Sequence, residues 1–318
     1  MMNKLLQFLK TWTLPVAMTI GALGYILYDA CDFSVEIRRF CWKAVELIQP
    51  ALLFAMMFLS SCKLSPSDLR WRKWHFSMLA VQLSAFVLLA LVSMYFCDKA
   101  CAVVLQAAML CMICPTATAS PVITAKLGGS TASITSYLIL VNLSVAIVVP
   151  IFLPLVNPTA GISFFSAFLS ILLKVFPLLL LPLFLAWIVR YFFPKLLQKI
   201  LTLSDLAFYL WAIALALAIA VTTRSLMQTQ IAWFLVLAIV LVSMLACALQ
   251  FYLGKKIGAP HDDKIAAGQS LGQKNTVFII WLGYTFLDPV TSLAGGLYSI
   301  WHNVYNSYQL YRQSKNRA

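Results

Sequence analysis

The chain has 318 residues, of which 62% are hydrophobic and only 10% are charged. Soluble domains carry about a quarter charged residues, so this composition excludes a soluble globular protein. Apolar runs long enough to cross a bilayer recur along the whole chain and predict an all-α polytopic membrane protein. The net charge of +13 comes mainly from short loops between these runs. Membrane topology accounts for this charge better than a nucleic-acid partner does.

Ten transmembrane helices are expected, forming a single transmembrane domain over 1–318. The spans lie roughly at 12–29, 43–62, 75–97, 101–127, 130–155, 163–189, 203–222, 229–253, 264–286 and 289–311. Sixteen Lys and Arg residues fall on the side of the membrane that holds both termini, and five fall on the other side. The positive-inside rule therefore predicts cytoplasmic termini in a bacterial inner (plasma) membrane.

An even split of the spans suggests two inverted five-helix repeats, about 12–155 and 163–311, because the second half starts on the opposite side from the first. The fourth span contains CPTATASP (114–121) and the ninth contains SLGQKN (270–275). Both stretches are poor helix formers and occupy corresponding places in the two halves. Paired interruptions of this kind indicate a binding site near the middle of the membrane.

Polar side chains at the two interruptions are the candidate site residues. They are Thr116, Thr118 and Ser120 in the first, and Ser270, Gln273, Lys274, Asn275 and Thr276 in the second. Helices that resume after a break present free N–H groups, which favour a small anion or a carboxylate. The alternative is that these groups only hold helices together. That alternative is favoured for any single Ser or Thr, whereas the two clusters together favour a site.

Further polar residues are predicted at membrane depth, including His302 and Asn303 in the tenth span and Gln82 in the third. No acidic residue is expected at mid-membrane, which removes the usual carboxylate for binding Na⁺ or a proton. No metal, phosphate or hydrolase motif occurs, so neither a cofactor nor an enzymatic activity is expected. A bridge between Cys31 and Cys41 stays open at this point.

Three segments together resemble the bile acid:sodium symporter family. CPTATASPVITAKLGG resembles the broken fourth helix of that family, GQKNTVF resembles its broken ninth helix, and LYSIWHN closely matches its last helix. The resemblance implies that helices 4 and 9 cross inside a core of spans 3–5 and 8–10. Spans 1, 2, 6 and 7 would form a separate panel. The resemblance also implies that the cargo is a bile acid or a smaller organic anion such as pantoate.

Carried over by position, the resemblance makes Thr118, Asn275, His302 and Asn303 substrate contacts and places Gln82 at a sodium site. The departures from the family pattern concern sodium. Ser270 stands where the family has a sodium-binding glutamate, Lys274 replaces a sodium-binding glutamine, and Pro121 replaces an asparagine. Most of the sodium ligands are therefore absent, and Na⁺ is not expected as the coupling ion.

Lys274 has three interpretations. It is a fixed substitute for bound sodium, or it gains and loses a proton so that H⁺ and anion binding are coupled, or it only extends to the cytoplasmic side. The resulting prediction is a sodium-independent transporter of a small organic anion in the lipid bilayer. The alternatives are a sodium-coupled symporter, an oxyanion or arsenite efflux permease, and a transport-dead receptor. The permeases carry a cysteine just after the fourth-helix proline, whereas Cys114 precedes Pro115 here.

Overall fold

The computed structural model describes residues 13–95, 99–158, 161–203, 206–228 and 232–317. The described residues form helices and connecting segments, with one isolated bridge between two connections. The longer helices are α2 (Thr13–Ala30), α3 (Val35–Ser61), α4 (Lys73–Tyr95), α5 (Lys99–Ile113), α7 (Thr131–Val156), α8 (Phe164–Phe192), α10 (Leu206–Gln228), α11 (Trp233–Gly258), α13 (Thr276–Phe286) and α14 (Leu293–Arg317). The shorter ones are α6 (Ser120–Lys126), α9 (Pro194–Thr202), α12 (Lys264–Gly272), η1 (Pro66–Asp68), η2 (Ala259–His261) and η3 (Pro289–Ser292).

Each predicted span overlaps one helix or one interrupted pair of helices. The fourth span is α5 followed by α6, and the ninth is α12 followed by α13. Six helices among the described residues are long and apolar enough to cross a membrane by themselves: α3, α4, α7, α8, α10 and α11. Helices suit these sequences because hydrocarbon offers no partner for backbone N–H and C=O groups, which must be satisfied within the segment.

Several boundaries differ from the prediction. Helix α3 begins at Val35, well before the expected start at 43, because Ser34 caps it by accepting a hydrogen bond from the Ile37 N–H at 3.4 Å. Serines 130 and 163 cap α7 and α8 in the same way. A serine before an apolar run is a helix-start signal that hydropathy alone does not detect.

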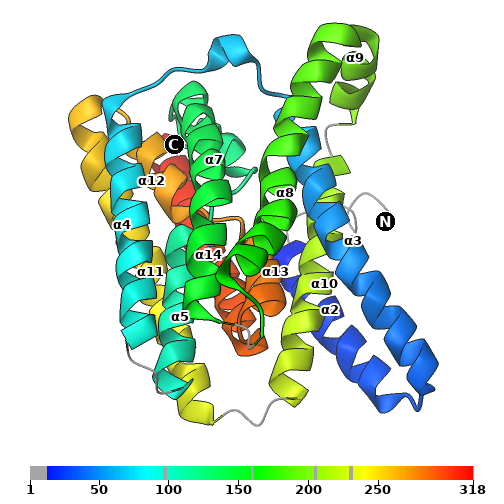
Figure 1. Cartoon of the computed structure of the whole chain (residues 1–318). Helices are drawn as coiled ribbons and strands as arrows, with labels where there is room; N and C mark the ends of the chain where they lie inside the picture. The colour runs from blue at the N-terminus through cyan, green and yellow to red at the C-terminus, as the bar shows by residue number, and fades with distance from the viewer. Residues whose placement is uncertain (1–12, 96–98, 159–160, 204–205, 229–231, 318) are drawn as a thin grey trace.

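Helix α9 was expected only as a connection between two spans. It is a nine-residue amphipathic helix, with Leu197 buried and Lys195 and Lys199 exposed. In Figure 1 it lies at one end of the molecule, above α8, on the same side as η1. Its position and amphipathic pattern suit the surface of a bilayer.

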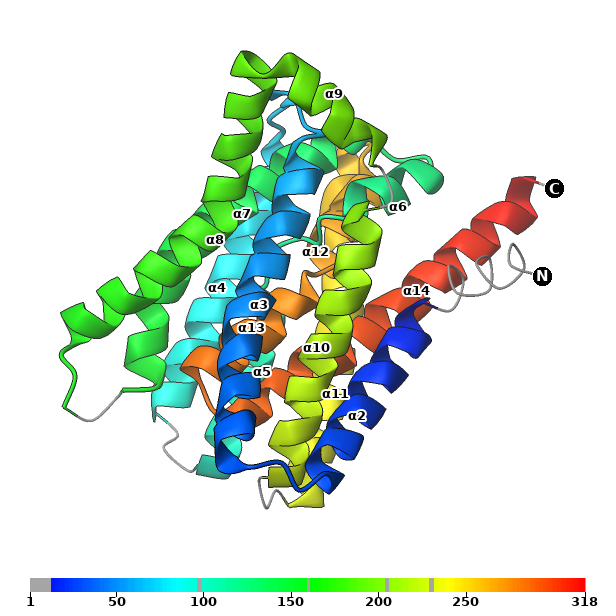
Figure 2. The ribbon, with the colours of Figure 1, turned by 90° about the vertical axis from the view of Figure 1, so that its right-hand side faces the viewer.

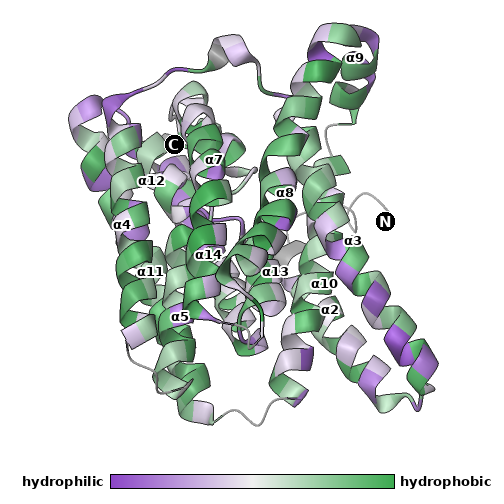
Figure 3. Ribbon diagram, in the orientation of Figure 1, coloured by the Kyte–Doolittle hydropathy of each residue, from purple (hydrophilic) through white to green (hydrophobic). Residues whose placement is uncertain are grey.

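The helices pack side by side in a bundle (Figures 1 and 2), and many large hydrophobic side chains are exposed on its outside. Hydrophobic residues cover most of the length of α4, α8 and α11, and a hydrophilic segment lies at mid-height between α12 and α13 (Figure 3). Helices from the first and second halves of the chain pack against each other: α2 packs against α10, and α3 packs against both α8 and α10. Gln273 and Lys274 in the hydrophilic segment at mid-height are buried, so this segment is enclosed by helices rather than exposed to lipid.

Cys31 and Cys41 are free thiols, so the bridge left open by the sequence is not formed. Cys41 lies inside α3, and Cys31 lies just after α2 in the short connection between the two helices.

Candidate functional site

The interruptions of the fourth and ninth spans meet each other inside the bundle. Residues 114–119 connect α5 to α6, and residues 273–275 connect α12 to α13. Thr116 and Lys274 face each other across this contact as an antiparallel bridge. The break after α12 is shorter than predicted, because the helix continues through Gly272. The two predicted clusters of polar residues are therefore brought together at one place, called the crossing below.

Backbone groups exposed by each break are satisfied by the other break. The Ala117 N–H donates to the Gln273 carbonyl at 2.8 Å, and the Asn275 N–H donates to the Pro115 carbonyl at 3.0 Å. An unpaired peptide group in hydrocarbon costs several kcal/mol, which makes a single broken helix unfavourable there. Two breaks that pair with one another remove much of this cost.

Gln82 of α4 holds the end of α5. Its Nε2 donates to the carbonyls of Ile113 at 2.9 Å and Cys114 at 3.0 Å, and its Oε1 accepts from the Tyr137 hydroxyl at 2.9 Å. All its polar atoms are therefore used, and the side chain is fully buried. The glutamine placed at a sodium site by resemblance here orients the carbonyl end of a half-helix.

Lys274 points its ammonium at the same end of α5. Its Nζ lies 3.5 Å from the Met112 carbonyl, and only 1% of the residue is exposed. The preceding carbonyl, that of Cys111, accepts from Gln250 Nε2 of α11 at 3.1 Å. No Asp or Glu among the described residues forms an ion pair with Lys274. The C-terminus of a helix carries partial negative charge, so the open carbonyl end of α5 stabilises this cation in the absence of a carboxylate.

The end of α12 is held in a corresponding way. The Thr116 hydroxyl donates to the Ser270 carbonyl at 2.6 Å, and the Tyr298 hydroxyl of α14 donates to the Gly272 carbonyl at 2.8 Å. Thr116 was predicted to contact substrate, but its hydroxyl is buried and committed to this carbonyl. Removing it would leave that carbonyl without its partner.

The remaining polar side chains of the crossing differ in whether they have hydrogen-bond partners. Ser120 Oγ donates to the Ala117 carbonyl at 2.6 Å. Ser270 Oγ and Gln273 Oε1 are buried and have no hydrogen-bond partner among the described residues. Thr276 is buried and Thr118 is half-buried. Buried polar atoms without partners are uncommon in folded proteins, so Ser270 and Gln273 are the groups most available to a bound ligand.

Asn275 has a structural role besides its predicted one. Its Oδ1 accepts from the Phe278 N–H at 3.3 Å and so caps the start of α13. This bond satisfies one of the N–H groups that were expected to face an anion. The side chain is half-buried, and its amide nitrogen makes no hydrogen bond within the described residues.

His302 and Asn303 make their described contacts within α14. His302 is buried, lies edge-on to the ring of Tyr298 at 5.8 Å between centroids, and has no partner for Nδ1. Asn303 Nδ2 donates to the Ser299 carbonyl at 2.7 Å. The link between these residues and the crossing is indirect, since Tyr298 contacts both His302 and the end of α12.

The sequence did not single out a second buried cluster, which lies around Asp263 at the start of α12. The Asp263 Oδ2 atom accepts hydrogen bonds from Trp74 Nε1 at 3.0 Å and from Ser133 Oγ at 3.1 Å, and it forms an ion pair with Arg72 at 3.0 Å. Asp263 lies one residue before the predicted ninth span, and hydropathy does not indicate whether a residue at such a place is buried. The cluster joins α4, α7 and α12 on the side where α9 and η1 lie.

Comparison with known proteins gives one family. A family model described as the SBF-like CPA transporter family matches residues 31–312. No curated protein matches the chain significantly. The matched range includes both interruptions, the crossing and nearly all of α14.

Proposed function

Because the chain belongs to the SBF-like CPA transporter family, we propose that it is a secondary transporter that moves a small organic anion by alternating access. The cargo is a carboxylate of the bile-acid or pantoate kind, and Lys274 takes the place of bound sodium. Membership in a transporter family and the apolar helices support transport as the general function.

The observation that carries the sodium-independent part is the position of the Lys274 ammonium. It lies against the carbonyl end of α5, next to the carbonyls held by Gln82. Carbonyl oxygens at the end of a half-helix are the groups that coordinate Na⁺ in transporters with broken helices. A tethered ammonium supplies the same positive charge without an ion from solution.

Ser270 supports the same proposal. It occupies the position where the resembled family has a sodium-binding glutamate, and its hydroxyl lies buried beside the crossing. A glutamate at this position would place a negative charge in the same buried region as Lys274 and offset its positive charge. With serine there, the positive charge of Lys274 stays available to an anionic substrate.

The ten-helix inverted repeat, with its panel and core, is part of the proposal. Helices α2, α3 and α10 pack mainly among themselves, as the panel requires, whereas α8 joins them through α3 and also packs extensively against α7. Helices α4, α5, α11, α12, α13 and α14 pack around the crossing, together with α7. In alternating access, substrate would enter between these two sets while the crossing stays intact.

Corresponding contacts beside the two half-helix ends support the repeat. Gln82 of the third span bonds with Tyr137 of the fifth, and Gln250 of the eighth span bonds with Tyr298 of the tenth. Each end also receives a side chain from the opposite break, Lys274 in one case and Thr116 in the other.

The test is uptake of radiolabelled carboxylates into proteoliposomes with and without an inward Na⁺ gradient. Uptake is expected to be the same in both conditions, because no sodium ion is needed to balance the site. Stimulation of several-fold by Na⁺ would contradict the proposal and favour a sodium-coupled symporter instead. A cargo that binds, as detected by a thermal shift, but is not taken up would favour the transport-dead receptor.

A further inference from the structure

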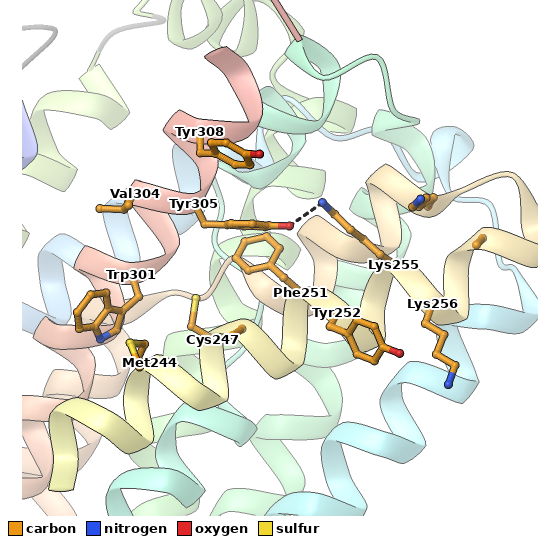
Figure 4. Close-up of a pocket in the computed structure, with 13 residues that line it drawn as sticks. Met244, Cys247, Phe251, Tyr252, Lys255, Lys256, Trp301, Val304, Tyr305 and Tyr308 are labelled. Carbon is orange, nitrogen blue, oxygen red and sulfur yellow. Dashed lines mark hydrogen bonds between the residues drawn. The ribbon is translucent and has the colours of Figure 1, made fainter. Parts of the chain in front are cut away.

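A groove of about 790 Å³ runs between α11 and α14 on the outside of the bundle. Its floor contains Cys247 and Phe251, which are buried. Figure 4 shows Trp301, Tyr305 and Tyr308 along the α14 side and Met244 on α11. The walls are therefore aliphatic and aromatic over most of their length, as a surface in contact with lipid chains requires.

One end of the groove is basic. Lys255 and Lys256 lie in the last turn of α11, and Lys264 begins α12. Lys255 is held in place by hydrogen bonds from Nζ to Tyr305 Oη at 2.9 Å and to Gln309 Oε1 at 2.7 Å. Lys256 and Lys264 are exposed. None of the thirteen lining residues is acidic, so nothing within the groove neutralises this charge.

We propose that this groove binds an anionic phospholipid, with an acyl chain along the apolar walls and the phosphate at the basic end. The groove is apolar along its walls and basic at one end, which matches a lipid in a leaflet, with its apolar chains inside the membrane and its charged headgroup at the surface. The lysines stand at the end of α11, where the basic residues predict the cytoplasmic surface. A fully aqueous ligand would leave the Met244 and Trp301 end of the groove unused.

The lipid would also touch the transport core through Phe251. The Phe251 ring lies against Gly272, where an added Cβ would come within 2.3 Å of it. Gly272 is the last residue of α12 before the break. A bound lipid is thus separated from the crossing by a single aromatic ring, and its site is distinct from that of the transported anion.

Native mass spectrometry of the detergent-purified protein tests the proposal with added phosphatidylglycerol or phosphatidylcholine. Phosphatidylglycerol is expected to remain bound at activation energies that remove phosphatidylcholine. The double variant Lys256→Gln/Lys264→Gln should weaken phosphatidylglycerol binding by on the order of tenfold, because each basic residue at a membrane surface adds to attraction for anionic lipid.

A matched control uses Lys195→Gln/Lys199→Gln on α9, which removes the same charge from two exposed lysines elsewhere. It should leave binding unchanged. A third variant, Val304→Trp, fills the groove at a residue that is 61% exposed and should weaken binding without altering charge. Equal losses in both charge variants, no effect of Val304→Trp, or equal retention of phosphatidylcholine would each overturn the proposal. A dimer that persists and excludes lipid would overturn it too, because a second copy would then cover the groove.

Discussion

Lys274 is the residue on which the sodium-independent proposal depends. Its ammonium donates to a single carbonyl, that of Met112, at 3.5 Å, so it is stabilised by the end of a helix rather than by one strong bond. This arrangement suits a charge that must also attract a substrate. A carboxylate partner would hold the lysine more tightly and would reduce its attraction for an anion.

The variant Lys274→Gln separates the possible roles of this charge. We expect carboxylate uptake to fall by about tenfold or more, because hydrogen bonds to charged groups contribute about 1.5–3 kcal/mol each. If the lysine carries the coupling proton, the remaining uptake should also lose its dependence on pH. The measurement is initial uptake in proteoliposomes across a range of pH values.

Lys174→Gln is the control for this experiment. Lys174 is exposed in α8, with its Nζ 5.5 Å from the ring of Phe286, and does not contact the crossing. It should retain both the rate and the pH profile of the unmodified protein. Loss of uptake in Lys274→Gln with an unchanged pH profile would exclude proton coupling through Lys274 and leave the fixed-charge role.

Thr116 and Thr118 form a second matched pair at the residue scale. Thr116→Val removes the donor to the buried Ser270 carbonyl, and we expect it to destabilise the protein by about 1–3 kcal/mol. Thr118→Val, at a half-buried position without such a bond, should cost much less. Thermal unfolding in detergent compares the two. Equal shifts in Tm would show that the hydroxyl bond contributes little.

The site illustrates which residues a sequence can and cannot indicate. Lys274 stood out because a lone cation in an apolar span is rare, and the structure does place it at the crossing. Gln250 and Tyr298 did not stand out, although both hold half-helix ends. Their role depends on which helices become neighbours, and this information is spread over residues far apart in the chain.

At the scale of elements, close helix packing depends on small residues. A Cβ added to Gly21 of α2 would lie 2.2 Å from the Ala216 carbonyl oxygen of α10, whereas one added to Gly24 would meet nothing within 4 Å. Helices in membranes associate through small residues that allow their backbones to approach closely. These two glycines lie on the same helix, so helix propensity affects both substitutions alike.

Gly21→Ala should therefore lower the thermal stability and loosen α2 from α10, since the backbone of α10 would have to move. Gly24→Ala should be neutral or stabilise the protein by up to about 1 kcal/mol, as expected for alanine in place of an exposed helical glycine. Thermal unfolding and limited proteolysis near α2 provide the readouts. A larger loss in Gly24→Ala than in Gly21→Ala would contradict the observed packing.

At the scale of the whole molecule, hydropathy predicted the order of the helices, and the prolines of 114–121 and the glycine and polar residues of 270–275 indicated the two that are interrupted. The prediction was wrong at some boundaries. Capping by Ser34 makes α3 begin earlier than expected, and the expected connection between two spans forms the amphipathic helix α9. It also could not show that the two breaks pair with each other. Pairing depends on the three-dimensional path of the helices, whereas hydropathy reports only the polarity along each one.

The antiparallel bridge between Thr116 and Lys274 has a consequence for how the chain can vary in length. In an antiparallel pair, residues directly opposite each other project to the same face, and a shift of one position sends each side chain to the other face. An insertion or deletion within 114–119 or 273–275 would therefore turn Lys274 away from the end of α5, even if every other residue were kept. The two connections are about 160 positions apart in the sequence, yet neither can change length without disturbing the pairing with the other.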